Sequence, residues 1–321
     1  MKTTHVPQFA REIRTASREV NPRIPSMMSR DERALLITLA RDFYRGDGVI
    51  IDAGVFCGAS TVAFGQGIVG NPARDQILAR WAKPIHTYEY GVVNPGMIAF
   101  FERHVVPGDW HVGDSFEGYL RTNIATVAGL VDLHMGDITT AQWYGAPIEI
   151  MFLDVLKSVD IQEGVMRTFL PMLKVGGILI QQDYFIDGVP FVKLLQEHLS
   201  GHFEYIGEIQ STALFRLVRP IPASLFTNDP ISALSLDTKL ALLDQARDRS
   251  IDIDRRLLCD TGKVRFLAEL GHLTTAQDCL EHVRSAYPDH FAGHPSPRIA
   301  SAIRAATNRA RGRVYRKPVE A

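Results

Sequence analysis

Apolar and polar positions alternate in blocks along the first two thirds of the chain. Segments with helical spacing of apolar residues, over 95–106, 115–129 and 160–173, lie between short apolar runs. These runs have the length of buried strands and read VIIDAG (49–54), PIHTYEYG (84–91), VDLHMGD (131–137), IEIMFLDV (148–155) and GGILIQQDYF (176–185). Alternation of this kind predicts a parallel sheet with helices on both faces.

Flanking segments complete this pattern. FEYIGEI and TALFRLVRP are joined by a polar turn at Gln210-Ser211 and predict an antiparallel pair at the sheet edge. Near the N-terminus, residues 29–32 have the form of a capping box, and helical spacing continues towards a stop at Gly46. The expected fold class is therefore α/β: a doubly wound, mostly parallel, Rossmann-like sheet with an antiparallel edge pair and a small helical C-terminal region.

The character of the chain changes near residue 220. A proline-containing segment with turn signals predicts a linker, and amphipathic helices follow it. KVRFLAELGHL and TTAQDCLEHVRSAYP together resemble one tetratricopeptide-like helix–turn–helix unit, with Gly271 at its turn. The expected divisions are an N-terminal helical segment (1–46), a main domain (47–220), a linker (221–235), a helical appendage (236–290) and a basic tail (291–321).

Composition is that of an ordinary soluble protein, with 46% apolar and 22% charged residues. No apolar run approaches the roughly 18 residues of a membrane span, and the N-terminus does not read as a secretory signal. Three cysteines without metal-like spacing favour a reducing compartment. We therefore expect a cytoplasmic protein with no membrane contact, and the net charge of −1 argues against a nucleic-acid partner.

Charge is nevertheless uneven at the C-terminus. Residues 290–319 contain no acidic residue, while arginines accumulate there. This tail could contact an anionic partner, but a solvated, frayed tail is the favoured interpretation. The helices before it could cover a sheet edge or mediate homo-oligomerisation.

The first chemical motif is VIIDAGVFCGAS at residues 49–60. An apolar strand ends at Asp52, and Gly54 and Gly58 then allow a tight turn and a close approach of backbone to ligand. Ser60 suits a helix N-terminus, whose free N–H groups attract anionic or polar ligand groups. The alternative is a tight strand–helix turn with no ligand.

Carboxylates also end the next two strands. Glu89 closes PIHTYEYG, where it could accept two hydrogen bonds from ribose hydroxyls or simply be an exposed charge. Asp137 closes VDLHMGD, where it could contact a ligand or cap the following turn.

The order of these pieces over residues 48–184 resembles that of class I S-adenosylmethionine-dependent methyltransferases. The pieces are D-x-G-x-x-x-G, a strand-end Glu, a strand-end G-D, a strand-end Asp and a GG strand. The resemblance implies S-adenosyl-L-methionine as cofactor, with its methionine end, ribose and adenine at successive strand ends. The implied residues are Asp52, Gly54, Gly58 and Ser60 for the methionine end, Glu89 for the ribose and Asp137 for the adenine side.

The fourth strand ends in F-L-D-x-x-K, which contains Asp154 and Lys157. Divalent-metal-dependent catechol-type O-methyltransferases carry a similar L-D-x-x-K, in which Asp binds the metal and Lys is the general base. Such a base is needed because a neutral hydroxyl is a poor nucleophile. The alternative is a salt bridge at the sheet rim, which contributes little stability.

The fifth strand supplies Asp183, the position of the second metal aspartate in that family. Macrolide-sugar O-methyltransferases are similar too, but have an acidic pair before a tyrosine where this chain has Gln182-Asp183-Tyr184. One expected oxygen ligand is therefore changed, and an amide binds Mg²⁺ more weakly than a carboxylate. Mg²⁺ at Asp154 and Asp183 is thus an open expectation, and Asp183 could instead be a turn residue.

Taken together, the resemblance implies transfer of a methyl group from S-adenosylmethionine to a hydroxyl of a small polar acceptor, with a sugar as one candidate. Lys157, Asp154 and Asp183 are the expected catalytic residues. Two alternatives are a hydroxylase of secondary metabolism with the same fold, and a catalytically degenerate binding or scaffold protein.

Overall fold

The computed structural model describes residues 6, 9–105, 110–143, 145–226 and 230–312. The chain divides into two compact units. The first unit comprises residues 1–182 and 202–223, and the second comprises residues 183–201 and 224–321. Among the described residues, no helix combines the length and the hydropathy that a membrane crossing requires.

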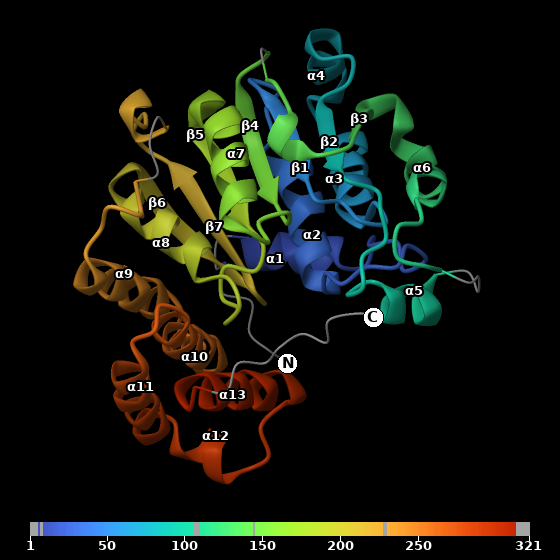
Figure 1. Cartoon of the computed structure of the whole chain (residues 1–321). Helices are drawn as coiled ribbons and strands as arrows, with labels where there is room; N and C mark the ends of the chain where they lie inside the picture. Colours follow the sequence, from blue (N-terminus) through green and yellow to red (C-terminus); the bar gives the residue numbers. More distant parts are fainter. Residues whose placement is uncertain (1–5, 7–8, 106–109, 144, 227–229, 313–321) are drawn as a thin grey trace. The chain divides into compact units, whose positions relative to one another are not determined.

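A seven-stranded sheet in the order β3-β2-β1-β4-β5-β7-β6 forms the centre of the first unit (Figure 1). Its neighbours are parallel from β3 to β5, and β7 is antiparallel to both β5 and β6. The predicted fold class is confirmed. The strands are β1 (Val49–Ala53), β2 (Ile85–Glu89), β3 (Val131–Met135), β4 (Ile148–Leu153), β5 (Leu173–Gln181), β6 (Phe203–Ile209) and β7 (Thr212–Leu217).

Helices of the first unit lie on both faces of this sheet. Phe64 of α3 contacts Phe152 of β4 on one face, and Phe169 of α7 contacts Tyr88 of β2 on the other. The helices are α1 (Ala10–Ala16), α2 (Arg30–Thr38), which continues as the π-helix η2 (Leu39–Phe43), α3 (Ala59–Val69), α4 (Arg74–Arg80), α5 (Ile98–His104), α6 (Glu117–Ile124) and α7 (Val159–Phe169).

The predicted start of α2 is confirmed, and the predicted end of the fifth strand is corrected. The Ser29–Glu32 capping box is present, with both of its reciprocal hydrogen bonds. The fifth strand, however, begins at Leu173 and ends at Gln181, so Asp183 lies beyond it. Asp183 adopts a left-handed φ of 62°, which turns the chain away from the strand direction.

Glu149, the polar residue within the apolar run of β4, is explained by its partners. It is 8% exposed, and its carboxylate accepts backbone N–H groups from Arg45 and Asp47, both at 2.7 Å. Burial raises its pKa, whereas these hydrogen bonds lower it. The side chain therefore ties the segment after η2 to the start of β4.

The second unit is helical. Gly271 has a left-handed φ of 85° at the predicted turn between α10 and α11. Its helices are α8 (Pro190–His198), α9 (Leu236–Arg249), α10 (Ile253–Glu269), α11 (Leu273–Ala286), α12 (Pro288–Ala292) and α13 (Pro297–Ala310).

The expectation of a frayed basic tail is wrong for residues 297–310. These residues form α13, which buries Ile299, Ala302, Ala306 and Ala310 in the core of the second unit. Small residues at helical spacing let α13 pack closely, so its arginines lie on a folded helix. Residues 313–321, which include Arg313, Arg316 and Lys317, lie outside the described residues.

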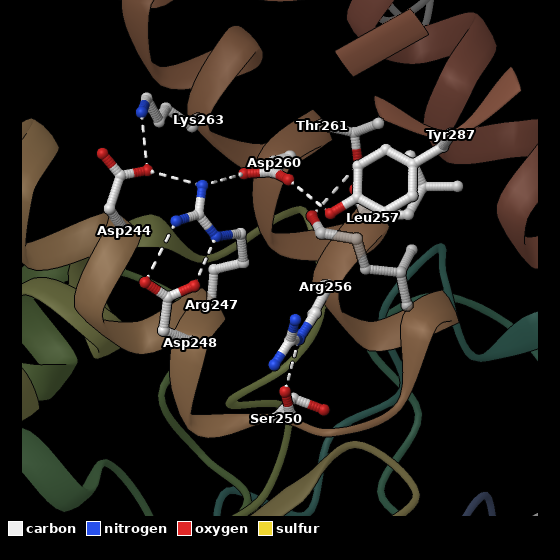
Figure 2. Close-up of polar contacts among 11 residues, drawn as sticks. Asp244, Arg247, Asp248, Ser250, Arg256, Leu257, Asp260, Thr261, Lys263 and Tyr287 are labelled. Atoms are coloured by element: carbon white, nitrogen blue, oxygen red, sulfur yellow. Dashed lines mark hydrogen bonds and ion pairs between the residues drawn. The ribbon is translucent and has the colours of Figure 1, made fainter. Parts of the chain in front are cut away.

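A polar network joins α9, α10 and the end of α11 (Figure 2). Arg247 pairs with Asp248 at 2.8 Å and with Asp244 at 3.1 Å. Asp260 of α10 accepts the Tyr287 hydroxyl at 2.6 Å, and both residues are buried. Burial raises the pKa of Asp260, and the Tyr287 hydrogen bond opposes that rise. These hydrogen bonds and ion pairs compensate the charged side chains of α9 and α10 that lie in the interior of the second unit.

We expect Tyr287→Phe to lower the free energy of unfolding by about 1–2 kcal/mol, because Asp260 then loses a donor in a buried setting. Urea unfolding of the full chain would measure this. Tyr90→Phe is the matched control, because Tyr90 is 63% exposed. Equal stability of the two variants would show that the Tyr287 hydrogen bond contributes nothing.

Candidate active site

The carboxyl ends of β2, β1 and β4 meet at one rim because β1 lies between its two parallel neighbours. Gly54 donates its N–H to the Tyr88 carbonyl at 2.9 Å, and Asp154 donates its N–H to the Ala53 carbonyl at 2.8 Å. The loop after β1, called here the glycine loop (residues 54–58), therefore starts beside the ends of β2 and β4. Ligands of open α/β sheets bind at such a crevice.

Two glycines of this loop meet strict steric limits. Gly54 has a φ of 83°, and a Cβ there would lie 2.7 Å from the Asp154 carbonyl carbon and oxygen. Gly58 precedes α3 with a φ of 90°, and a Cβ there would lie 2.6 Å from Ile124 Cγ2. Only glycine fits either position without displacing its neighbours. The loop consequently brings bare backbone and the N-terminal amides of α3 to the rim.

Asp52 joins the end of β1 to the start of α3. Its Oδ2 accepts the Thr61 hydroxyl at 2.6 Å and the Ser60 hydroxyl at 3.2 Å. The side chain is fully buried, and burial raises its pKa to about 7 against the lowering effect of these two hydrogen bonds. Within the described part of the chain, its Oδ1 has no hydrogen-bond partner. That oxygen is an acceptor suited to an ammonium or hydroxyl group of a ligand.

Glu89, at the end of β2, closes the other side of the glycine loop. Its carboxylate accepts the Phe56 N–H at 2.7 Å and the Gly91 N–H at 3.0 Å, one on each oxygen. Each oxygen of an ionised carboxylate can accept a second hydrogen bond. The carboxylate therefore both fixes the loop and keeps acceptor capacity for the hydroxyls of a ribose.

Asp137 performs the capping role that the sequence left open. Its side chain accepts the Thr139 N–H at 2.9 Å and the Thr139 hydroxyl at 2.7 Å, which caps the short 3₁₀ helix η4 (Ile138–Thr140). These hydrogen bonds lower its pKa. Gly136, Asp137 and Ile138 also line one end of a cavity of about 700 Å³, so this strand end borders a space that can hold a ligand.

Asp154 and Lys157 lie in the loop between β4 and α7. Lys157 Nζ contacts Asp154 Oδ1 at 2.9 Å, and the lysine side chain is 53% exposed. This is the rim ion pair of the sequence alternative, and it lies beside the glycine loop because Asp154 backbone atoms meet Gly54. A carboxylate and an ammonium thus lie beside the glycine loop.

The positions after β5 fit a metal less simply than the resemblance implies. Gln182 is buried, and its amide contacts the hydroxyls of Thr212 and Ser211. Asp183 belongs to the second unit. Of the two predicted metal ligands, the first unit therefore contains Asp154, which contacts Lys157. A Mg²⁺ site at Asp154 and Asp183 stays a prediction.

Tyr184 is a buried residue of the second unit. Its hydroxyl donates to Glu197, which Arg249 also contacts through two hydrogen bonds of 2.6 and 2.7 Å. Burial raises the pKa of Tyr184 well above its ordinary value. This network gives Tyr184 a packing role within the helical unit.

His86, Asp132 and His134 form a cluster that the sequence did not reveal. Its sequence signal is weak: H-x-Y in β2 and D-x-H in β3 place polar groups at alternate positions, which share a face of a strand. Only the pairing of the two strands brings the three side chains together.

No family model matches the chain, and no curated protein matches it. Among solved structures, the O-methyltransferase NovP is 14% identical, with 61% of this chain and 83% of that chain covered and a TM-score of 0.44. An O-methyltransferase from Bacillus cereus in complex with S-adenosylhomocysteine is 11% identical, with 67% and 90% covered and a TM-score of 0.38.

CalS11, a TDP-rhamnose 3′-O-methyltransferase of calicheamicin biosynthesis, is 13% identical. The similarity covers 65% of this chain and 94% of that chain, with a TM-score of 0.36. These solved neighbours are methyltransferases, but the TM-scores are below 0.5. The function proposed for this chain is therefore based on its own rim residues.

The buried Asp52 predicts a pH dependence of stability. In the folded protein the pKa of Asp52 is raised to about 7, so the unfolded chain loses this proton at a lower pH than the folded protein does. The free energy of unfolding therefore falls as the pH rises towards 7. Between about pH 5 and about pH 7 this costs about 2 kcal/mol, a loss that Asp52→Asn should remove. Urea unfolding of both proteins at the two pH values would measure it. Parallel pH dependence in the two proteins would contradict the assignment.

Proposed function

We propose that this protein is a methyltransferase that binds S-adenosylmethionine at the rim formed by the carboxyl ends of β1, β2, β3 and β4. The proposal rests on one observation: the glycine loop, the N-terminus of α3 and the Glu89 carboxylate converge there. It agrees with the resemblance of the D-x-G-x-x-x-G motif and the strand-end carboxylates to class I methyltransferases. The methyl acceptor we propose is a hydroxyl of a small polar molecule, with sugars as the first class to test.

Each part of the cofactor has a proposed place. The amides at the start of α3 suit the methionine carboxylate, because helix N-termini favour anions. The free Oδ1 of Asp52 suits the methionine ammonium. The remaining acceptor sites of Glu89 suit the ribose hydroxyls, and the cavity beside Asp137 suits the adenine.

When bound, S-adenosylmethionine supplies an electrophilic methyl group. The acceptor oxygen forms a bond to that methyl carbon while the carbon–sulfur bond breaks, and the hydroxyl proton must pass to a base. Lys157 is the proposed base, beside the glycine loop. Lys157 can take that proton only as the neutral amine. It must therefore first release its own proton to solvent, and its ion pair with Asp154 opposes this release, so acceptor binding must relax the contact.

Calorimetric titration of the full chain with S-adenosylhomocysteine tests the cofactor site. We expect micromolar binding that Glu89→Gln weakens about tenfold or more, because the amide replaces one acceptor oxygen by a donor. Glu102→Gln, an exposed change on α5, is the matched control and should bind normally. No binding to the unaltered protein at millimolar ligand would overturn the proposal.

Lys157→Ala tests the base. Turnover with an accepted hydroxyl substrate should fall about 10²–10⁴-fold, while the affinity for S-adenosylhomocysteine stays within about threefold. Lys174→Ala is the matched control, since Lys174 also pairs with an aspartate, Asp47, at 2.9 Å. Full turnover without Lys157 would remove it as the base. Cofactor binding without methyl transfer to any of a panel of sugars and phenols would favour the hydroxylase or scaffold alternative.

A further inference from the structure

Three ligand-type side chains gather on one face of the sheet. His86 of β2 pairs in register with Asp132 of β3, and Tyr88 pairs with His134. Because alternate residues of a strand share a face, the side chains at 86, 132 and 134 project to the same side. Ile85, the neighbour of His86, belongs instead to the apolar core on the opposite face.

The distances among the three groups suit one ion. His86 Nδ1 lies 3.3 Å from His134 Nε2, and Asp132 Oδ2 lies 3.8 Å from the first and 3.5 Å from the second. Tetrahedral ligands at about 2.0–2.1 Å from a Zn²⁺ ion are about 3.4 Å apart. The three atoms therefore have the spacing of one triangular face of such a site.

Neighbouring side chains hold these ligands in position. The Tyr88 ring stacks on His134 with centroids 4.5 Å apart, and Trp143 contacts His86 edge-on at 4.8 Å. Lys83 Nζ lies 3.4 Å from Asp132 Oδ1, which leaves Oδ2 near the histidines. Metal ligands are commonly oriented in this way by surrounding groups.

The alternative is a metal-free cluster in which one imidazole donates a hydrogen bond to the other.

We propose that His86, Asp132 and His134 bind one divalent transition-metal ion of the Zn²⁺ type. Two imidazoles and a carboxylate favour such an ion over Mg²⁺, which prefers oxygen ligands. Both histidines line the cavity of about 700 Å³, together with Trp143. The fourth coordination position is thus open to water or to an oxygen or nitrogen atom of a molecule in that cavity. This inference does not depend on the proposed methyltransferase activity.

Cobalt titration tests the site. Untagged full-length protein, stripped with a chelator, is titrated with Co²⁺ and followed by its visible d–d absorption. We expect one Co²⁺ per chain, displaced by Zn²⁺ but not by Mg²⁺. His86→Ala and His134→Ala should each weaken binding about tenfold or more, whereas His282→Ala, an exposed change on α11, should not.

Asp132→Asn is a second test that holds even if the histidine variants misfold. The Asp132 side chain is 43% exposed and the change is isosteric, so this variant should fold. Circular dichroism verifies that each variant is folded. Weaker Co²⁺ binding in folded Asp132→Asn supports the site. Co²⁺ affinity unchanged in Asp132→Asn, or no Co²⁺ binding by the unaltered protein, would overturn the proposal and leave a hydrogen-bonded cluster.

Discussion

The close approach of Gly54 to the backbone of Asp154 is the constraint on which the rim depends. A Cβ at Gly54 would lie 2.7 Å from the Asp154 carbonyl, so the end of β1 and the end of β4 can meet only through glycine. This contact starts the glycine loop in a left-handed conformation and aims the N-terminus of α3 along the rim. The glycine loop and the loop that carries Asp154 and Lys157 become neighbours because of it. The same backbone geometry therefore brings together the residues of the proposed cofactor site.

The rim also concentrates negative charge. Asp52 and Glu89 are buried, and both Asp154 and Glu89 raise the pKa of Asp52 by repulsion, beyond the larger effect of burial. The two buried carboxylates are stabilised differently: Glu89 by two backbone N–H groups and Asp52 by two hydroxyls. A folded protein gains nothing from crowding carboxylates alone. A cationic ligand that carries a sulfonium and an ammonium group would relieve this repulsion between carboxylates. The relieved repulsion would strengthen the binding of that ligand.

The sequence predicted those parts of the structure that local patterns determine. The strand positions followed from the apolar runs. The glycine loop followed from Gly54 and Gly58, because a left-handed backbone turn favours glycine. Its failures involve packing between distant segments. The sequence did not predict helix α13 because its buried stripe is mostly alanine. Alanines among arginines give only a weak apolar pattern, and their burial depends on contact with α10. The His86–Asp132 contact needs the β2–β3 register, which no local signal encodes. The predicted strand GGILIQQDYF runs past Gln181, where β5 ends, because no glycine marks the left-handed turn at Asp183.

The connection between β3 and β4 explains why histidines lie on a face of the sheet that would normally be covered. Doubly wound sheets bury both faces under crossover helices. Here the described residues of that connection contain only the 3₁₀ helix Ile138–Thr140, and the cavity lies over β2 and β3 instead. A solvent-reached face requires polar groups, yet His86 is still buried enough for its pKa to fall to about 4. There the two imidazoles and the carboxylate contact one another, and in the site we propose a bound cation would take the place of these contacts. The short connection therefore leaves the space in which the proposed ion would bind.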